Sequence, residues 1–173
     1  MSFSIKTTIR AFVAPEHRVS CRRELWEQIL AQLDQRGERV HESGAFLLGV
    51  RRKQRCEVRD FIFYDELDAG AYNSGVCILS GSAFASLWAR CRKIGLTVVA
   101  DVHTHPGSAG QSDTDRRNPM VARSGHIAII VPRYAVPPVD TKALGIYEYR
   151  GDHEWTHHDE GQRGRFFYVG LWS

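Results

Sequence analysis

The sequence has 173 residues, of which 43% are hydrophobic and 25% charged, and its 23 basic and 20 acidic side chains leave a net charge of +3. A chain of this length and composition fits one domain spanning residues 1–173, and so balanced a charge argues against nucleic acid as a partner. No apolar run approaches the roughly 18 residues of a membrane span, and Met1 to Arg10 lack the apolar centre of a signal peptide, so we expect a cytoplasmic protein with no membrane partner.

The first part of the chain is expected to form a strand, a helix and a pair of strands. Ile5 to Val13 alternates apolar and polar residues, which predicts a half-buried strand. Val19 to Gly37 has the spacing of an amphipathic helix, with Ser20 as its N-cap. Two strands follow over Ala45 to Arg51 and Glu57 to Tyr64, and the basic tip between them is interpreted as solvated.

The second part begins with a loop over Asp65 to Gly75, which is rich in turn formers. Ser80 to Ile94 predicts a second helix, and the apolar runs Leu96 to Val102 and His126 to Val131 predict buried strands, with a short helix from Ser112 between them. The remaining segments are a loop over Pro132 to Thr141 and strands over Leu144 to Tyr149, Glu154 to Thr156 and Phe166 to Val169. This order predicts a mixed α and β fold around one sheet.

The chemistry is expected where the first of these buried strands ends. His103 and His105 are two residues apart, so their side chains point to the same side of a strand and can share one ion. Pro106 cannot continue the strand, and the glycines after it let the chain return and deliver Asp115 as an oxygen ligand. Two nitrogen ligands and one carboxylate leave a fourth position open, which is typical of a catalytic site with one zinc ion.

Other interpretations of these residues remain open. Ser112 and Asp115 have the spacing of a helix capping box, which needs no metal. Asp101 and Asp113 are alternative carboxylate ligands, and Asp101 would point the same way as the two histidines. The joint occurrence of these features after a buried strand favours the metal site. A second group, His153, His157 and His158, lies in a polar turn and is interpreted as solvated surface.

A zinc hydrolase also needs a group that moves protons, because the water and the leaving amine exchange one during the reaction. Glu42 is the best candidate, since it precedes an apolar strand that could pair beside the metal strand. Ser112 is expected to donate a hydrogen bond to the oxyanion that forms on the substrate carbonyl.

Three segments together resemble the JAMM motif of the JAB1/MPN metalloprotease family: Glu42-Ser43-Gly44, His103-Thr104-His105-Pro106 and Ser112-Asp113-Thr114-Asp115. The resemblance implies a single-domain JAB1/MPN fold, similar to the cytidine-deaminase-like arrangement, in which helices flank a curved mixed β-sheet. It implies zinc held by the two histidines and Asp115, with Glu42 as general acid/base and Ser112 as oxyanion stabiliser.

Members of this family cleave isopeptide or peptide bonds after the C-terminal tail of ubiquitin or ubiquitin-like proteins. The compact chain resembles bacterial, deubiquitinase-like members, some of which accompany E1-like and E2-like enzymes in antiphage defence. We therefore expect a zinc isopeptidase with a ubiquitin-like protein as its partner. The alternatives are a processing enzyme for a sulfur-carrier protein or small amide, and a non-catalytic MPN scaffold. The expected substrate-binding residues are Gly44, Ala45, Tyr72 and Asn73.

Overall fold

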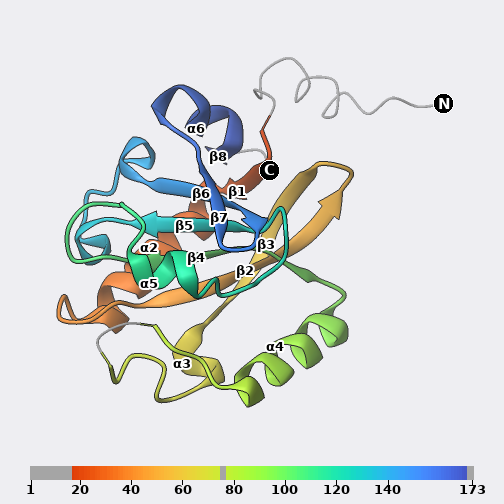
Figure 1. Ribbon diagram of the computed structural model, residues 1–173, viewed down its shortest axis with the longest axis vertical. Coiled ribbons are helices and arrows are strands. Elements are labelled where there is room, and N and C mark those ends of the chain that lie inside the picture. The colour runs from red at the N-terminus through yellow and green to blue at the C-terminus, as the bar shows by residue number, and fades with distance from the viewer. Residues whose placement is uncertain (1–16, 75–76, 171–173) are drawn as a thin grey trace.

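The computed structural model describes residues 17–74 and 77–170, and the expected strand Ile5 to Val13 lies outside them (Figure 1). Within these residues one mixed sheet has the strand order β7-β6-β5-β4-β2-β3-β1-β8. The strands are β1 Val19–Arg22, β2 Gly44–Arg52, β3 Arg55–Phe63, β4 Thr97–Thr104, β5 Ile127–Val131, β6 Gly145–Gly151, β7 Glu154–His157 and β8 Phe167–Gly170. The adjacent strands β2 and β4, at whose ends two of the three motif segments lie, are therefore in the middle of the sheet.

Both long helices that the sequence predicts are present. The helical segments are α2 Arg23–Gly37, α3 Tyr64–Leu67, α4 Gly81–Ile94, α5 Asp113–Arg117 and α6 Glu160–Phe166, with 3-10 turns at Arg133–Ala135 and Thr141–Ala143. The Ser80 side chain caps α4, and Gly95 ends it in the left-handed conformation, at φ 68°. The short helices α3 and α6 have no counterpart in the prediction, because each is too short to carry a hydrophobic period. In the described part of the chain, no helix is long and apolar enough to cross a membrane.

The prediction for the start of α2 is wrong by four residues. Val19–Arg22 forms strand β1, which pairs in parallel with both β3 and β8. Ser20 is therefore not an N-cap; it is buried, and its hydroxyl lies 3.4 Å from the carbonyl oxygen of Cys56. Tertiary pairing overrides the local helical pattern here, since Val19 and Cys21 are fully buried between strands.

The sheet is covered on both faces by helices, and β2 shows how the faces are filled. Ala45 and Leu47 belong to the core cluster that includes α2, whereas Phe46 and Leu48 pack with the residues of α4. All four side chains are fully buried, and burying a large apolar side chain contributes roughly 1.5–3 kcal/mol. Helix α4 and the segment around α5 lie on one side of the sheet in Figure 1, and α2 lies behind it.

A bulge in β4 decides which way the motif side chains point. Leu47 pairs with Ala100 but the next residue, Leu48, pairs with Val98, so β4 has one extra residue at this place. Beyond the bulge, Asp101 pairs with Phe46 and so shares its face of the sheet. The bulge thereby turns the following histidine positions toward the side of α4 and α5, instead of into the core beneath α2.

Candidate metal centre

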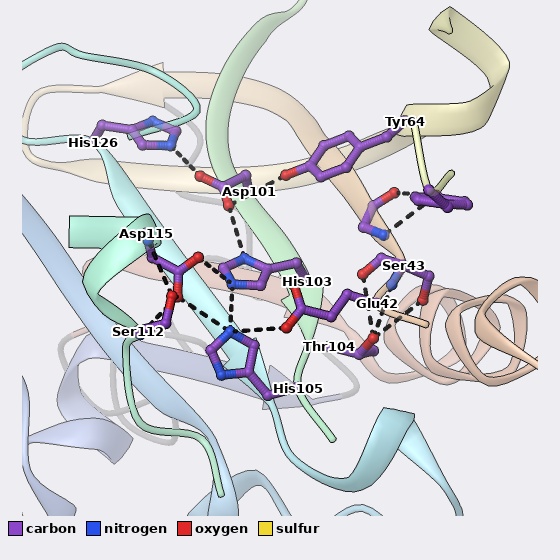
Figure 2. A network of polar contacts seen from close by, with 12 residues as sticks. Glu42, Ser43, Tyr64, Asp101, His103, Thr104, His105, Ser112, Asp115 and His126 are labelled. Atoms are coloured by element: carbon purple, nitrogen blue, oxygen red, sulfur yellow. Dashed lines mark hydrogen bonds and ion pairs between the residues drawn. The ribbon is translucent and has the colours of Figure 1, made fainter. Parts of the chain in front are cut away.

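His103, His105 and Asp115 converge at the end of β4 (Figure 2). The two Nε2 atoms lie 3.1 Å apart, and Asp115 places Oδ1 3.6 Å from His103 Nε2 and Oδ2 3.2 Å from His105 Nε2. Both histidines are nearly buried, at 6% and 7% exposure. A tetrahedral zinc ion with bonds of about 2.0–2.1 Å separates its ligand atoms by about 3.3 Å. The three donor atoms therefore have the separations and chemistry of a metal site.

The electrostatics of the cluster agree with a cation at its centre. Burial opposes the imidazolium form of His103, but the carboxylates of Asp101 and Asp115 outweigh it and raise the pKa of His103 to about 10. Burial would likewise raise the pKa of Asp115, but hydrogen bonds from the two histidines hold it far below its usual value. The site thus favours a positive charge among these donors. Either a bound proton or a metal ion would supply that charge.

Each histidine is held by the backbone around it. His103 belongs to β4, where it pairs with Ile130 of the parallel strand β5. His105 follows the last residue of β4, and its N–H donates to the carbonyl of Val131 at 2.9 Å while its own carbonyl accepts from the N–H of Tyr134, also at 2.9 Å. The imidazoles are therefore carried by backbone that is held on both sides. This reduces the conformational entropy that the protein would lose when a metal orders the two rings.

Asp115 is aimed by the capping box at the start of α5, so the capping interpretation and the metal interpretation hold together. The Ser112 N–H and hydroxyl both donate to Asp115 Oδ2, at 2.8 and 2.7 Å, and the Asp115 N–H donates to Ser112 Oγ at 3.1 Å. The local cap fixes the carboxylate while its oxygens remain close to the histidines. The hydroxyl of Ser112 is engaged with Asp115 in this arrangement.

Strands β6 and β7 hold the returning loop in place. The Tyr147 hydroxyl donates to the carbonyl of Ala109 at 3.1 Å, and the Trp155 indole N–H donates to the carbonyl of Arg116 at 3.1 Å. Gly145 allows the close approach, because a Cβ there would lie 2.0 Å from the Ala109 oxygen. The sequence contained no pattern that linked these residues to the metal loop.

Glu42 reaches the same site from the segment just before β2. Its Oε1 lies 3.8 Å from His105 Nε2, and its side chain is 14% exposed. Burial raises the pKa of Glu42, and the nearby charges of His105 and His103 oppose that shift. Glu42 thus lies beside the His-His-Asp cluster, and its carboxyl group has a higher affinity for a proton than an exposed one.

Asp101 lies beside the metal cluster but is not one of its three members. Its Oδ2 is 3.7 Å from His103 Nδ1, the nitrogen that faces away from the other ligands, and its Oδ1 is 2.5 Å from His126 Nε2. The Tyr64 hydroxyl donates to Oδ2 at 3.4 Å. Sequence spacing indicated the direction of Asp101, whereas no pattern pointed to His126 or Tyr64. The other alternative, Asp113, is 83% exposed and pairs with Arg117.

The four expected substrate-binding residues differ in where they lie. Ala45 is fully buried, and β2 pairs with β3 and β4 on both sides; a substrate contact at Ala45 stays a prediction. Its strand is central, and both its backbone edges and its side chain are occupied. Tyr72 accepts from the Gly44 N–H at 3.3 Å and donates to the Gly44 carbonyl at 3.1 Å. Asn73 is exposed on the same loop.

A cavity of about 370 Å³ adjoins the cluster. Glu42, His103 and Asp115 form part of its wall. Apolar side chains from α4, strand β7 and the surrounding loops form another part: Ile78, Leu79, Phe84, Pro119, Met120 and Trp155. The cavity has the volume of a small-ligand pocket, and its wall is mainly apolar with a few convergent polar groups. These features are typical of a substrate site.

The second histidine group does not form a metal cluster in the residues that the structure covers. His153 and His157 are exposed, as expected. The expectation of a solvated His158 is wrong, because its ring stacks on Phe166 at 3.8 Å and its Nε2 lies 3.4 Å from Glu148 Oε2. Helix α6, which the sequence pattern did not predict, covers this histidine.

Fold and site together define a mixed α/β protein whose curled sheet presents a His-His-Asp cluster compatible with a metal ion. No protein-family model matches the chain. The chain is 26% identical over 138 residues to "Probable metalloprotease y4jG" of Sinorhizobium fredii (strain NBRC 101917 / NGR234), a match that covers 79% of this chain and 85% of the relative.

Two solved bacterial structures share the fold. Protein DSY2949 of Desulfitobacterium hafniense superposes with a TM-score of 0.61 at 17% identity, covering 87% of this chain and 92% of that protein. A protein of Salinibacter ruber (strain DSM 13855) superposes with a TM-score of 0.55 at 20% identity, covering 81% and 88%. At these identities the likeness concerns the fold alone.

Proposed function

We propose that this protein is a zinc-dependent metalloprotease of the JAMM type. The observation that carries the proposal is the convergence of three donor atoms from His103, His105 and Asp115, with the Glu42 carboxyl 3.8 Å from one of them. The similarity to a relative that is named as a probable metalloprotease supports the same class of reaction. A single zinc ion fits the donor set of two imidazoles and a carboxylate.

The residues of the site have different roles in the proposed amide hydrolysis. Bound zinc would act as a Lewis acid and lower the pKa of water toward about 7. Glu42 takes a proton from the water oxygen as that oxygen bonds to the substrate carbonyl carbon. The same carboxyl then gives the proton to the amine nitrogen as the C–N bond breaks, so that the products are an acid and an amine. In this proposal the Ser112 hydroxyl, which donates to Asp115 Oδ2 in the structure, donates to the oxyanion instead once that oxyanion forms.

The proposed substrate is the C-terminal tail of a ubiquitin-like protein, joined to a target or to the rest of its precursor. The support is the resemblance of the three motif segments to the JAMM pattern, together with an apolar cavity beside Glu42 and His103 that suits a peptide chain. We place the reaction in a cytoplasmic, bacterial ubiquitination-like pathway of the antiphage kind, with E1-like and E2-like enzymes as further partners.

Cleavage of an extension added to the C-terminal tail of a ubiquitin-like protein tests this proposal. The zinc-loaded protein is incubated with a ubiquitin-like protein that carries a C-terminal extension, and the products are followed by mass spectrometry. We expect cleavage at the end of the tail, loss of cleavage after treatment with a chelator, and recovery when zinc returns. Activity that persists without metal would contradict the mechanism.

A short peptide substrate and a binding measurement separate the alternatives. Equal turnover of a short peptide with the tail sequence would favour a sulfur-carrier or small amide substrate, because the folded modifier would then contribute nothing. Binding of the ubiquitin-like protein without any cleavage, by a protein that retains zinc, would favour a non-catalytic scaffold.

A further inference from the structure

Asp101 lies at the centre of a buried polar network behind the metal ligands. It is 1% exposed, and its partners His126 and Tyr64 are 4% and 0% exposed (Figure 2). His126 and Tyr64 contact different oxygens of the carboxylate, at 2.5 and 3.4 Å. Burying a carboxylate is costly unless its oxygens are satisfied. A group held so firmly among polar partners indicates a role beyond packing.

The same carboxylate faces the back of a metal ligand. His103 directs Nε2 toward His105 and Asp115, whereas its Nδ1 points to Asp101 Oδ2 at 3.7 Å. That Nδ1 has no hydrogen-bond partner among the described residues, although it is buried. A metal-binding histidine usually donates its second N–H to a carboxylate or carbonyl, which fixes its tautomer and ring orientation. Asp101 is the carboxylate placed to accept that proton.

Gly44 connects this network to the start of β2. A Cβ at Gly44 would lie 2.2 Å from the ring of Tyr64, so only glycine lets the ring lie over this position. The Tyr64 ring in that place carries the hydroxyl to Asp101. Gly44 also pairs with His103 across β2 and β4. The need for glycine after Glu42 and Ser43 is therefore explained by the approach of Tyr64.

We propose that Asp101 is a positioning residue for His103, and that His126 and Tyr64 hold Asp101 in place. In the metal-loaded protein, Asp101 Oδ2 accepts the Nδ1–H of His103, which leaves the Nε2 lone pair directed at the ion. His126 donates its Nε2–H to Oδ1, and Tyr64 donates to Oδ2. This inference rests on the proposed zinc site, but it does not depend on the peptidase reaction or on its substrate.

Zinc affinity measured by competition with a chromophoric chelator tests the inference, with Asp101→Asn as the main variant. We expect zinc affinity to fall about 10- to 100-fold, the usual effect of losing such an outer partner. Asp113→Asn, at an exposed carboxylate near the same site, removes the same charge and is expected to bind zinc like the wild type. Equal affinities in the two variants would overturn the proposal.

A nitrogen-15 spectrum of the zinc-loaded protein distinguishes positioning from a general loss of structure. In the wild type we expect a slowly exchanging Nδ1–H on His103, and in Asp101→Asn we expect it to disappear or shift. An unchanged His103 N–H signal in this variant would contradict the proposal. Because the spectrum and the affinity require no substrate, a wild type that binds zinc but cleaves nothing would count against the proposed function alone.

Variants at His126 provide a test if Asp101→Asn does not fold. His126→Gln keeps an N–H donor near the position of Nε2, so it is expected to retain zinc affinity close to wild type. His126→Leu removes the donor and is expected to share the loss seen when Asp101 is changed. If both variants remain folded and bind zinc equally well, His126 has no part in holding Asp101, and the proposed network is wrong.

Discussion

Ser43 and Thr104 are joined by hydrogen bonds, among them one to a side chain and one between backbone groups. The Ser43 N–H donates to Thr104 Oγ1 at 3.0 Å, and the Thr104 N–H donates to the Ser43 carbonyl at 2.9 Å. Both residues are fully buried, and each is a chain neighbour of a site residue: Glu42 in one case, His103 and His105 in the other. This pair therefore fixes the position of Glu42 relative to His103 and His105.

Replacing Thr104 by Val is expected to impair turnover more than zinc binding. The variant keeps the shape of the side chain but leaves the buried Ser43 N–H without its acceptor, which costs about 1–3 kcal/mol of unfolding free energy. The start of β2 loosens, so Glu42 loses its position while the metal ligands remain. Thermal unfolding, zinc affinity and turnover of the tail extension measure the three effects. Thr97→Val, at the far end of β4, is the control, and an unchanged turnover in Thr104→Val would contradict this role.

Replacing Glu42 by Gln is expected to stop proton transfer without releasing the metal. The amide cannot accept a proton from water, and loss of a general acid/base typically costs about 10²- to 10⁴-fold in rate. Zinc affinity should stay close to wild type, because Glu42 lies 3.8 Å from His105 Nε2 and is not among the three ligands. Glu27→Gln, an exposed position on α2, serves as the matched control. Retained turnover in Glu42→Gln would exclude the proposed role.

Replacing Gly145 by Ala is expected to displace the loop that carries Asp115. The new methyl group would lie 2.0 Å from the Ala109 carbonyl oxygen, which the backbone must move to accommodate. Overpacking of this kind typically costs about 1–3 kcal/mol, and here it should also weaken zinc binding. Gly107→Ala is the control in the same loop, because nothing lies within 4 Å of its added Cβ. Chelator competition on both variants checks the prediction, which fails if they bind zinc equally.

Zinc binding is expected to weaken as the pH falls. Burial disfavours the charged form of His103, but Asp101 and Asp115 raise its pKa to about 10, so the metal-free protein holds a proton there at neutral pH. Zinc needs the unprotonated nitrogen, and its binding must therefore release that proton. Below the raised pKa, each lowering of the pH makes protons compete more strongly with zinc for the nitrogen of His103. Calorimetry in buffers of different ionisation enthalpy measures the release; a release of no proton at pH 7 would contradict this prediction.

The sequence by itself determined the features that depend on near neighbours in the chain. Local patterns include two histidines separated by one residue, the proline after them and the cap from Ser112 to Asp115. The structure brings His103, His105 and Asp115 together as a cluster. The amphipathic spacing of α4 likewise defines its buried face without reference to other elements.

Only the tertiary structure decided how these local pieces face one another. The β4 bulge arises from pairing with β2, and it alone turns Asp101 and His103 toward α4. The contact between Asp101 and His126 joins residues 25 positions apart, and the contact between Tyr64 and Asp101 joins residues 37 apart. No local period encodes such contacts, because they depend on which strands pair and in which register. The sequence thus determined which atoms can bind a metal, and the fold of the sheet determined what holds those atoms in place.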